Sequence, residues 1–136
     1  LEETFIIFKL KAFSRNLRKE VSKMSKYYFY DLGIRNFLIN NFNPLSFRND
    51  IGQLWENFLI SERMKYHAYS GISTNAFFWR IYTGAELDYV EETGGQLTGY
   101  EFKFTRPAKK PPKAWKETYD AQYEAINREN YLSFIT

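Results

Sequence analysis

The pattern of apolar and polar positions predicts a chain that alternates short strands with amphipathic helices. Residues 4–13 are rich in β-branched and aromatic side chains and are typical of a strand, and a shorter run of the same kind follows at 27–31. The polar, basic stretch 14–26 between them is expected to be a turn or connector. Further strands are expected at 76–84, 86–92, 97–105 and 131–136.

Apolar residues spaced by three or four positions predict a long helix over residues 51–67, with Asp50 well placed as its N-cap. Two further helices are expected at 32–42 and 114–129. Three prolines exclude regular structure from the loop 106–113. The order β-α-α-β-β-β-α-β predicts an α/β chain of the α+β kind, with a central mixed β-sheet flanked by helices.

The most specific local pattern is a β-hairpin around a two-residue Gly-Gly turn. This turn pairs Thr93 with Gln96, Tyr89 with Tyr100, Asp88 with Glu101, and Glu86 with Lys103. Because side chains alternate across a strand, charged residues then share one face and apolar residues the other. The expected apolar face comprises Leu87, Tyr89, Tyr100, Phe102 and Phe104. A turn shifted by one residue would set Asp88 opposite Gly99 instead.

The charged face of this hairpin is a candidate metal site. Facing carboxylates destabilise a strand pair by up to ~1 kcal/mol, whereas a divalent cation between them reverses that sign. Mg²⁺ or Mn²⁺ usually takes one or two carboxylates and fills its remaining positions with water. Asp88 and Glu101 are therefore candidate ligands, and Lys103 could hold or activate a water beside the metal. The alternative is a solvated strand face with a Glu86–Lys103 pair and two exposed acids.

Charge is distributed unevenly along the 136 residues. Seven Lys or Arg lie between Lys9 and Lys26, six lie between Lys103 and Lys116, and the segment between has five basic and nine acidic residues. Basic flanks around an acidic centre fit a phosphate-binding surface around a metal, or simply solvated surface and a linker. The chain has no cysteine and no apolar run long enough to span a membrane, so we expect a cytoplasmic protein.

Two levels of resemblance follow from these motifs. Asp88, followed after about a dozen residues by the "EFK" of residues 101–103, resembles the PD-(D/E)xK nuclease superfamily, which often adds an acid from the preceding helix; Glu56 matches that position. The longer blocks "KYYFYDLGIRNFL", "IGQLWENFLISE", "FFWRIYTGAELDYV" and "GYEFKF" resemble an uncharacterised family of domains found C-terminal to bacterial and archaeal AAA-type P-loop ATPases. The chain departs from the superfamily in lacking a proline before the aspartate.

The resemblance implies a restriction-endonuclease-like core over residues 27–136. It implies that 1–26 is a connector or the remnant of a winged-helix wing, and that an N-terminal ATPase domain is missing from this chain. It further implies a catalytic set in which Asp88 and Glu101 bind Mg²⁺ or Mn²⁺. Lysines of the proline-rich loop that follows could contact the DNA backbone. The catalytic set is Glu56, Asp88, Glu101 and Lys103, and the DNA-binding lysines are Lys109, Lys110 and Lys113.

The sequence therefore supports two main hypotheses of function. The first is a Mg²⁺-dependent endonuclease that hydrolyses phosphodiester bonds in DNA. The second is a catalytically inactive module that binds nucleic acid or protein and regulates the ATPase; a purely structural oligomerisation domain is a third interpretation. Glu62 rivals Glu56 as the accessory acid, because the helical wheel sets it near the centre of the apolar stripe, where it would need Arg80 or Lys65 as a partner. His67, the only histidine, is interpreted as structural.

Overall fold

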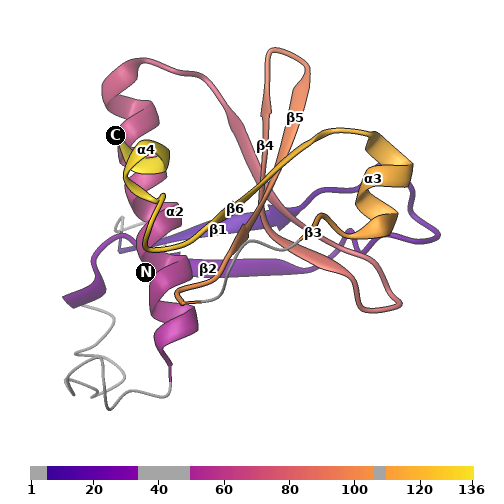
Figure 1. Ribbon diagram of the computed structural model, residues 1–136, viewed down its shortest axis with the longest axis horizontal. Coiled ribbons are helices and arrows are strands. Elements are labelled where there is room, and N and C mark those ends of the chain that lie inside the picture. Colours follow the sequence, from indigo (N-terminus) through magenta and orange to yellow (C-terminus); the bar gives the residue numbers. More distant parts are fainter. Residues whose placement is uncertain (1–5, 34–49, 106–109) are drawn as a thin grey trace.

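A computed structural model describes residues 6–33, 50–105 and 110–136 of the chain, and Figure 1 shows its elements. Its strands are β1 (Ile7–Ala12), β2 (Ser25–Phe29), β3 (Asn75–Arg80), β4 (Glu86–Thr93), β5 (Gln96–Phe102) and β6 (Gln122–Ile126). Its helices are α2 (Ile51–Ser70), α3 (Lys113–Tyr119) and α4 (Leu132–Ile135). Within these residues no helix is long and apolar enough to cross a membrane.

The strands form one six-stranded sheet in the order β2-β1-β3-β4-β5-β6. The pairs β1–β3 and β5–β6 are parallel, and the other neighbours are antiparallel. The expected α+β chain with a central mixed sheet is therefore confirmed. Strand β1 lies between β2 and β3, so residues 7–12 belong to the same sheet as the later strands. The expected division of the chain at residue 26 stays a prediction.

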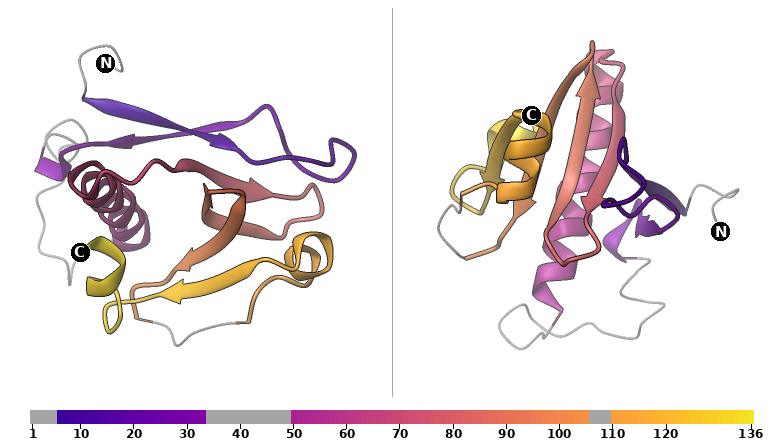
Figure 2. Two further views of the ribbon diagram at one scale, coloured as in Figure 1. Left: turned by 90° about the horizontal axis from the view of Figure 1, so that it is seen from above. Right: turned by 90° about the vertical axis from the view of Figure 1, so that its right-hand side faces the viewer.

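Two hydrophobic clusters pack against opposite sides of this sheet. The larger one joins α2 and α4 to the strands, with Leu59 and Phe134 among its buried residues. The smaller one joins α3 to the strands through Trp115, which packs with Trp79. Figure 2 shows the sheet curving around α2 and α4, while α3 lies at the far end of the molecule. Helix α2 contacts both the edge strand β2 and strand β5.

The hairpin of β4 and β5 has the expected register, which runs from Thr93 opposite Gln96 to Tyr89 opposite Tyr100. Gly94 and Gly95 both have positive φ angles, of 57° and 82°, as a turn of this type requires. The expected long helix is also present, as α2. Asp50 lies at its N-cap position, but its side chain makes no capping hydrogen bond there. The helix continues to Ser70.

A β-bulge in β4 corrects the expected division of its side chains between two faces. Phe77 pairs with Val90 and Trp79 with Leu87, so two residues of β4 lie opposite Phe78 alone. These two are Asp88 and Tyr89. Because a bulge adds one residue, it shifts the alternation of the strand and re-aims side chains. Leu87 was expected beside Tyr89, but it packs instead in the smaller cluster with Trp79, whereas Tyr89 lies in the larger one.

The C-terminal third differs from the prediction. The expected helix 114–129 is wrong beyond Tyr119: Asp120 takes a left-handed conformation, with φ of 46°, and β6 follows. The expected final strand 131–136 is also wrong, because this segment contains α4. Pairing with β5 outweighs the helical propensity of the β6 sequence. The helix expected at 32–42 and the loop at 43–50 lie almost wholly outside the described residues.

Candidate functional site

The carboxylate of Asp88 is held between β4 and β5. Its Oδ2 accepts a hydrogen bond of 2.7 Å from the backbone N–H of Phe102, a residue that directly follows Glu101. Burial, and after it the neighbouring charge of Glu56, raise the pKa of Asp88 to about 6, although the hydrogen bond from the Phe102 N–H and the charge of Lys26 both act to lower it. The charge of Glu101 also raises it. Asp88 is therefore an acid in an environment that opposes its ionisation.

Glu56 reaches this site from α2 and is held by β2. The hydroxyl of Tyr28 donates a hydrogen bond of 2.9 Å to Oε1 of Glu56, and Nζ of Lys26 lies 3.7 Å from the same oxygen. Asn57 fixes the helix against this strand, because its side-chain amide exchanges two hydrogen bonds with the backbone of Phe29, at 3.0 and 2.7 Å. The bulge in β4 changes the direction of Asp88, and the hydrogen bonds of Asn57 fix α2 against β2. Together they place the carboxylate of Glu56 near that of Asp88.

Glu101 and Lys103 form the third part of the site at the end of β5. Nζ of Lys103 lies 3.8 Å from Oε1 of Glu101, and the hydroxyl of Tyr123 on β6 donates a hydrogen bond of 3.0 Å to Oε2. The charges of Glu101 and of Asp88 both raise the pKa of Tyr123, after the larger effect of burial. The structure thus brings the four predicted catalytic residues into one electrostatic neighbourhood.

Two residues of β2 that the sequence analysis did not single out belong to the same neighbourhood. The ammonium of Lys26 lies 4.9 Å from the ring centroid of Phe78, and Tyr28 is buried. Both line a hollow of about 400 Å³ that also includes Glu56. Their i, i+2 spacing on a strand was the available signal, since it sets both side chains on one face. Only the tertiary structure shows that this face meets Glu56.

The other acidic candidates pair with basic residues that are not part of this site. Glu86 pairs with Arg80 at 2.8 Å on the surface, so the alternative Glu86–Lys103 pair does not form. Glu62, expected near the centre of the apolar stripe, is partly exposed, and its Oε1 lies 3.1 Å from Nζ of Lys65. Of the two candidates for the accessory acid, the helix aims Glu56 and not Glu62 at Asp88.

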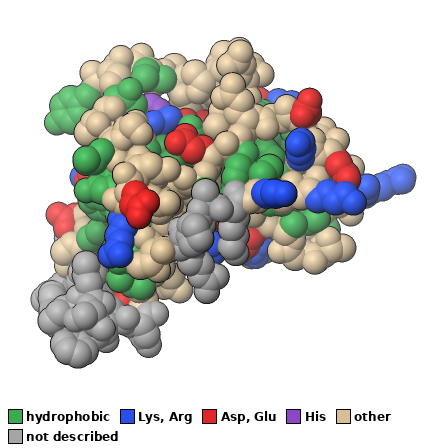
Figure 3. Space-filling model, in the orientation of Figure 1, with side chains coloured by type: hydrophobic (Ala, Val, Ile, Leu, Met, Phe, Trp, Pro, Cys, Tyr) green, Lys and Arg blue, Asp and Glu red, His purple; other side chains and the backbone are tan. Residues whose placement is uncertain are grey.

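Of the predicted DNA-binding lysines, the two that the structure describes lie at or just before the start of α3. Lys110 is exposed, Lys113 begins α3 with its Nζ 3.7 Å from Glu117, and Lys109 lies outside the described residues. Figure 3 shows Lys and Arg side chains gathered at the end of the molecule where α3 lies, with a few acidic ones between them. This face combines basic charge with solvent access, and the role of its lysines stays a prediction.

The donor types at the site fit a hard divalent cation. Three carboxylates, those of Glu56, Asp88 and Glu101, face two ammonium groups, and oxygen atoms are the ligands that Mg²⁺ and Mn²⁺ prefer. Among residues 6–33, 50–105 and 110–136, however, no three His, Cys, Asp or Glu side chains are close enough together to hold one ion. The described residues therefore do not form a protein cage of three or more acids, and the binding of one ion by Asp88 and Glu101 stays a prediction.

The sequence was compared with protein families, curated proteins and solved structures. Residues 1–45 match the model of a domain of unknown function, DUF8612, and residues 51–133 match that of a second one, DUF4143. No curated protein and no solved structure matches the chain. The second match covers all the predicted catalytic residues and more than half of the 136 residues. The chain therefore belongs to the DUF4143 family of domains of unknown function.

Proposed function

We propose that this domain is a divalent-metal-dependent nuclease-like domain that hydrolyses phosphodiester bonds in DNA and lies C-terminal to an AAA-type ATPase. The proposal includes membership of the PD-(D/E)xK superfamily and a restriction-endonuclease-like core. The observation that carries it is the partly buried carboxylate of Asp88, which lies near Glu56 and Glu101 although the like charges of these three carboxylates repel one another. Titratable groups with strongly shifted pKa values concentrate at functional sites.

Each residue has a distinct part in the proposed reaction. Asp88 and Glu101 would hold Mg²⁺ or Mn²⁺, which when bound lowers the pKa of a coordinated water and offsets negative charge on the phosphate. Lys103 would orient the attacking water and contact a non-bridging phosphate oxygen. Glu56, whose Oε1 is fixed by Tyr28, would accept a hydrogen bond from that water or take its proton. Lys26 would offset part of the negative charge that Glu56 brings to the site.

The basic residues after the site would contact the DNA backbone. Lys110 and Lys113 are solvent-accessible on the α3 side, and Lys109 belongs to the same lysine-rich segment. Contacts of this kind release counterions, so binding should weaken steeply with salt. Removing one such lysine should reduce the salt dependence and weaken binding to all sequences alike.

A nuclease assay tests the proposal directly. Single-stranded, duplex and branched DNA are incubated with the protein, with and without Mn²⁺, for the wild type and for Asp88→Asn and Lys103→Met. We expect metal-dependent cleavage by the wild type and at least a hundredfold loss in both variants. Glu62→Gln is the matched control, because Glu62 is an acid of the same helix as Glu56 that pairs with Lys65 on the surface. Equal cleavage by Asp88→Asn and the wild type would refute the assignment.

A second candidate function is a catalytically inactive module that regulates the ATPase by binding nucleic acid or protein. It is favoured by the lack of a three-ligand acidic group in the part of the chain that the structure describes. The two functions make different predictions for the carboxylates. An inactive module should bind DNA with the same affinity with or without Mn²⁺, and Asp88→Asn should leave that affinity unchanged.

A further inference from the structure

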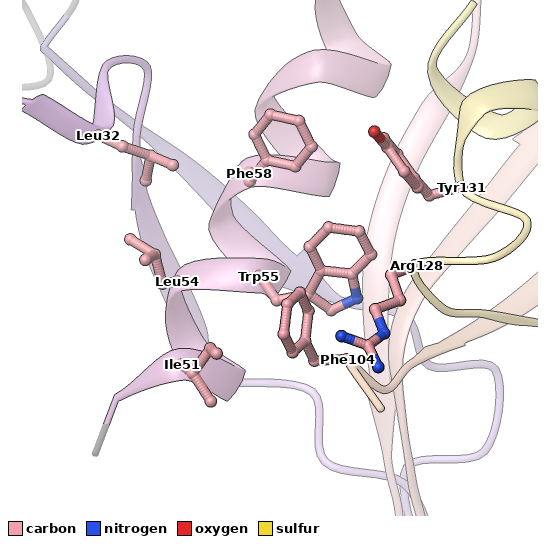
Figure 4. Close-up of a pocket in the computed structure, with 8 residues that line it drawn as sticks. All are labelled: Leu32, Ile51, Leu54, Trp55, Phe58, Phe104, Arg128 and Tyr131. Carbon is pink, nitrogen blue, oxygen red and sulfur yellow. The ribbon is translucent and has the colours of Figure 1, made fainter. Parts of the chain in front are cut away.

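A second pocket lies on the other flank of α2. It has a volume of about 340 Å³, and Figure 4 shows its walls. Leu54, Trp55 and Phe58 come from the helix, and Phe104 and Tyr131 come from the segments after β5 and β6. The ring centroid of Trp55 lies 5.3 Å from those of Phe104 and Tyr131 and 5.8 Å from that of Phe58. These ring contacts give the pocket a fixed aromatic wall.

Two hydrogen-bond donors lie beside this pocket, one buried and one exposed to solvent. The indole N–H of Trp55, a residue only 9% exposed, has no hydrogen-bond partner among the described residues. The guanidinium of Arg128 stacks 5.5 Å from the ring centroid of Phe104, and within the described part of the chain it forms no ion pair. Figure 4 shows the indole nitrogen and the guanidinium on the same side of the pocket.

The two donors restrict what the pocket can bind. A buried donor left without an acceptor destabilises the protein, so an acceptor supplied by a ligand would recover this energy. The guanidinium favours a negative charge on that acceptor, and none of the acidic residues that the structure describes lines the pocket to compete with it. The remaining walls are almost wholly apolar. A ligand that satisfies all of these groups has an apolar body and a single anionic head.

We propose that this pocket binds an apolar carboxylate, that is, a carboxylate carried by an aromatic or medium-length aliphatic group. One carboxylate oxygen accepts a hydrogen bond from the indole N–H of Trp55, and the other accepts one from the guanidinium of Arg128. The apolar body of the ligand lies against Phe58 and Tyr131. The volume is near the lower end of the ~300–1,000 Å³ found for small-molecule sites, which suits a small acid. The same chemistry occurs in a free acid and at the C-terminus of a peptide that ends in an apolar residue.

The proposal does not depend on the nuclease-like function. Trp55 and Glu56 are neighbours on α2, but Glu56 faces β2 and Trp55 faces Phe104 and Tyr131. The two sites therefore use different flanks of the same helix. Loss of metal binding or of cleavage leaves the pocket's walls and donors unchanged.

The indole N–H signals of the three tryptophans offer a direct measurement. ¹H–¹⁵N spectra of the protein are recorded during titration with 3-phenylpropionate and with octanoate, and the Trp55 signal is assigned from Trp55→Phe. 3-Phenylpropanol and octanol are the uncharged controls. We expect a saturable shift of the Trp55 signal, little change for Trp79 and Trp115, and at least tenfold weaker binding of the alcohols. No saturable shift, or equal affinity for acid and alcohol, would overturn the proposal.

A variant separates the anion site from the apolar walls. Arg128→Met keeps a long side chain over Phe104 and should weaken acid binding about tenfold while leaving alcohol binding unchanged. Lys116→Met on α3, outside the pocket, is the matched control and should bind the acids as the wild type does. Unchanged acid binding in Arg128→Met would contradict the proposal.

One further titration distinguishes the two sources of the carboxylate. N-Acetyl-leucyl-phenylalanine carries the same head group at the end of a peptide. Tighter binding of this compound than of either free acid supports the site and identifies a peptide C-terminus as its occupant, whereas weaker binding supports a free acid. A shift of the Trp55 signal with protein concentration alone, without response to any acid, indicates an interface between copies of the chain and overturns the proposal.

Discussion

Strand β4 and helix α2 meet at two places, and the charges are balanced at only one of them. At one end Arg63 of α2 binds Glu91 of β4 through two hydrogen bonds of 2.8 Å, and a third donor of Arg63 bonds the carbonyl of Phe134 at 2.6 Å. Two helical turns earlier, Glu56 of α2 faces Asp88 of β4. One contact pairs opposite charges, and the other sets two carboxylates near each other.

The difference separates a structural contact from a candidate functional one. Glu91 is only 5% exposed, yet its charge is compensated by Arg63, and Nε2 of His67 lies 3.5 Å away. Burial lowers the pKa of His67, so the imidazole is mostly neutral at pH 7 and the guanidinium carries the compensation. Among the residues that the structure describes, Asp88 has no such partner, and the charge of Lys26 lowers its pKa without offsetting the effects of burial and Glu56. An acid that the fold keeps without a compensating charge does not stabilise the protein. Its presence therefore favours a functional role for Asp88.

The largest expected effect concerns the balanced contact. Arg63→Met leaves the buried charge of Glu91 without its partner and should lower the free energy of unfolding by about 3–5 kcal/mol. Urea denaturation followed by circular dichroism measures it. Arg80→Met is the matched control: the Arg80–Glu86 pair is largely exposed and should contribute less than about 1 kcal/mol. Similar losses of stability in both variants would show that burial does not increase the contribution of the Arg63–Glu91 pair.

The next effect has the opposite sign. Asp88→Asn removes an acid whose pKa is about 6 in the folded protein and near 3.8 when unfolded, and the amide oxygen still accepts the N–H of Phe102. Because the folded state binds the proton more tightly, wild-type stability falls as the pH rises from about 4 to above 6. The variant should therefore be more stable than the wild type at pH 7.5, by up to about 3 kcal/mol.

The pH dependence of that difference is the control. Denaturation at pH 4 should show the wild type and Asp88→Asn nearly equal, since Asp88 is then largely protonated in the folded protein and carries little charge. A constant difference between pH 4 and pH 7.5 would mean that the substitution acts through packing and not through the charge of Asp88.

A smaller effect is expected from the metal. If Asp88 and Glu101 hold Mn²⁺, a free concentration ten times the dissociation constant should stabilise the folded state by about 1.4 kcal/mol at pH 7.5. Thermal melting at increasing Mn²⁺ measures it. The increase in melting temperature should disappear in Asp88→Asn and persist in Glu62→Gln. If the melting temperature of the wild type does not change with Mn²⁺, the proposed metal site is wrong.

The smallest effect concerns the contact that holds Glu56. Tyr28→Phe deletes the hydroxyl that bonds Glu56 and should lower the free energy of unfolding by about 0.5–1.5 kcal/mol. Tyr27→Phe, in the same strand but 54% exposed, should be nearly neutral. If the nuclease-like proposal holds, Tyr28→Phe should also reduce cleavage more than Tyr27→Phe does, because Glu56 is then less firmly placed.

Local patterns were sufficient where the chain pairs with itself over a short distance. The Gly-Gly turn predicted the register of β4 and β5, and the spacing of apolar residues predicted most of α2. They failed for β6 and α4. Tyr123 and Ala125 have a strand neighbour only because β5 lies beside them, and Phe134 is buried against Tyr89, Tyr100 and Phe102. Contacts this distant along the sequence leave no local signal.

The site shows the same limit. The motif around Asp88, Glu101 and Lys103 was recognised from the sequence, and the family resemblance added Glu56. Lys26 and Tyr28 were missed, because their place beside Glu56 depends on the packing of β2 against α2. The bulge in β4 was missed as well, because an extra residue in one strand becomes visible only when its partner is known.

The sequence by itself determined which residues could carry charge chemistry and which segments could bury apolar surface, since both depend on side-chain type and short-range spacing. Only the tertiary structure decided which charges meet. Burial and distance set the energy of a charge, so Glu91 beside Arg63 and Asp88 beside Glu56 have different consequences although both are acids of the same strand.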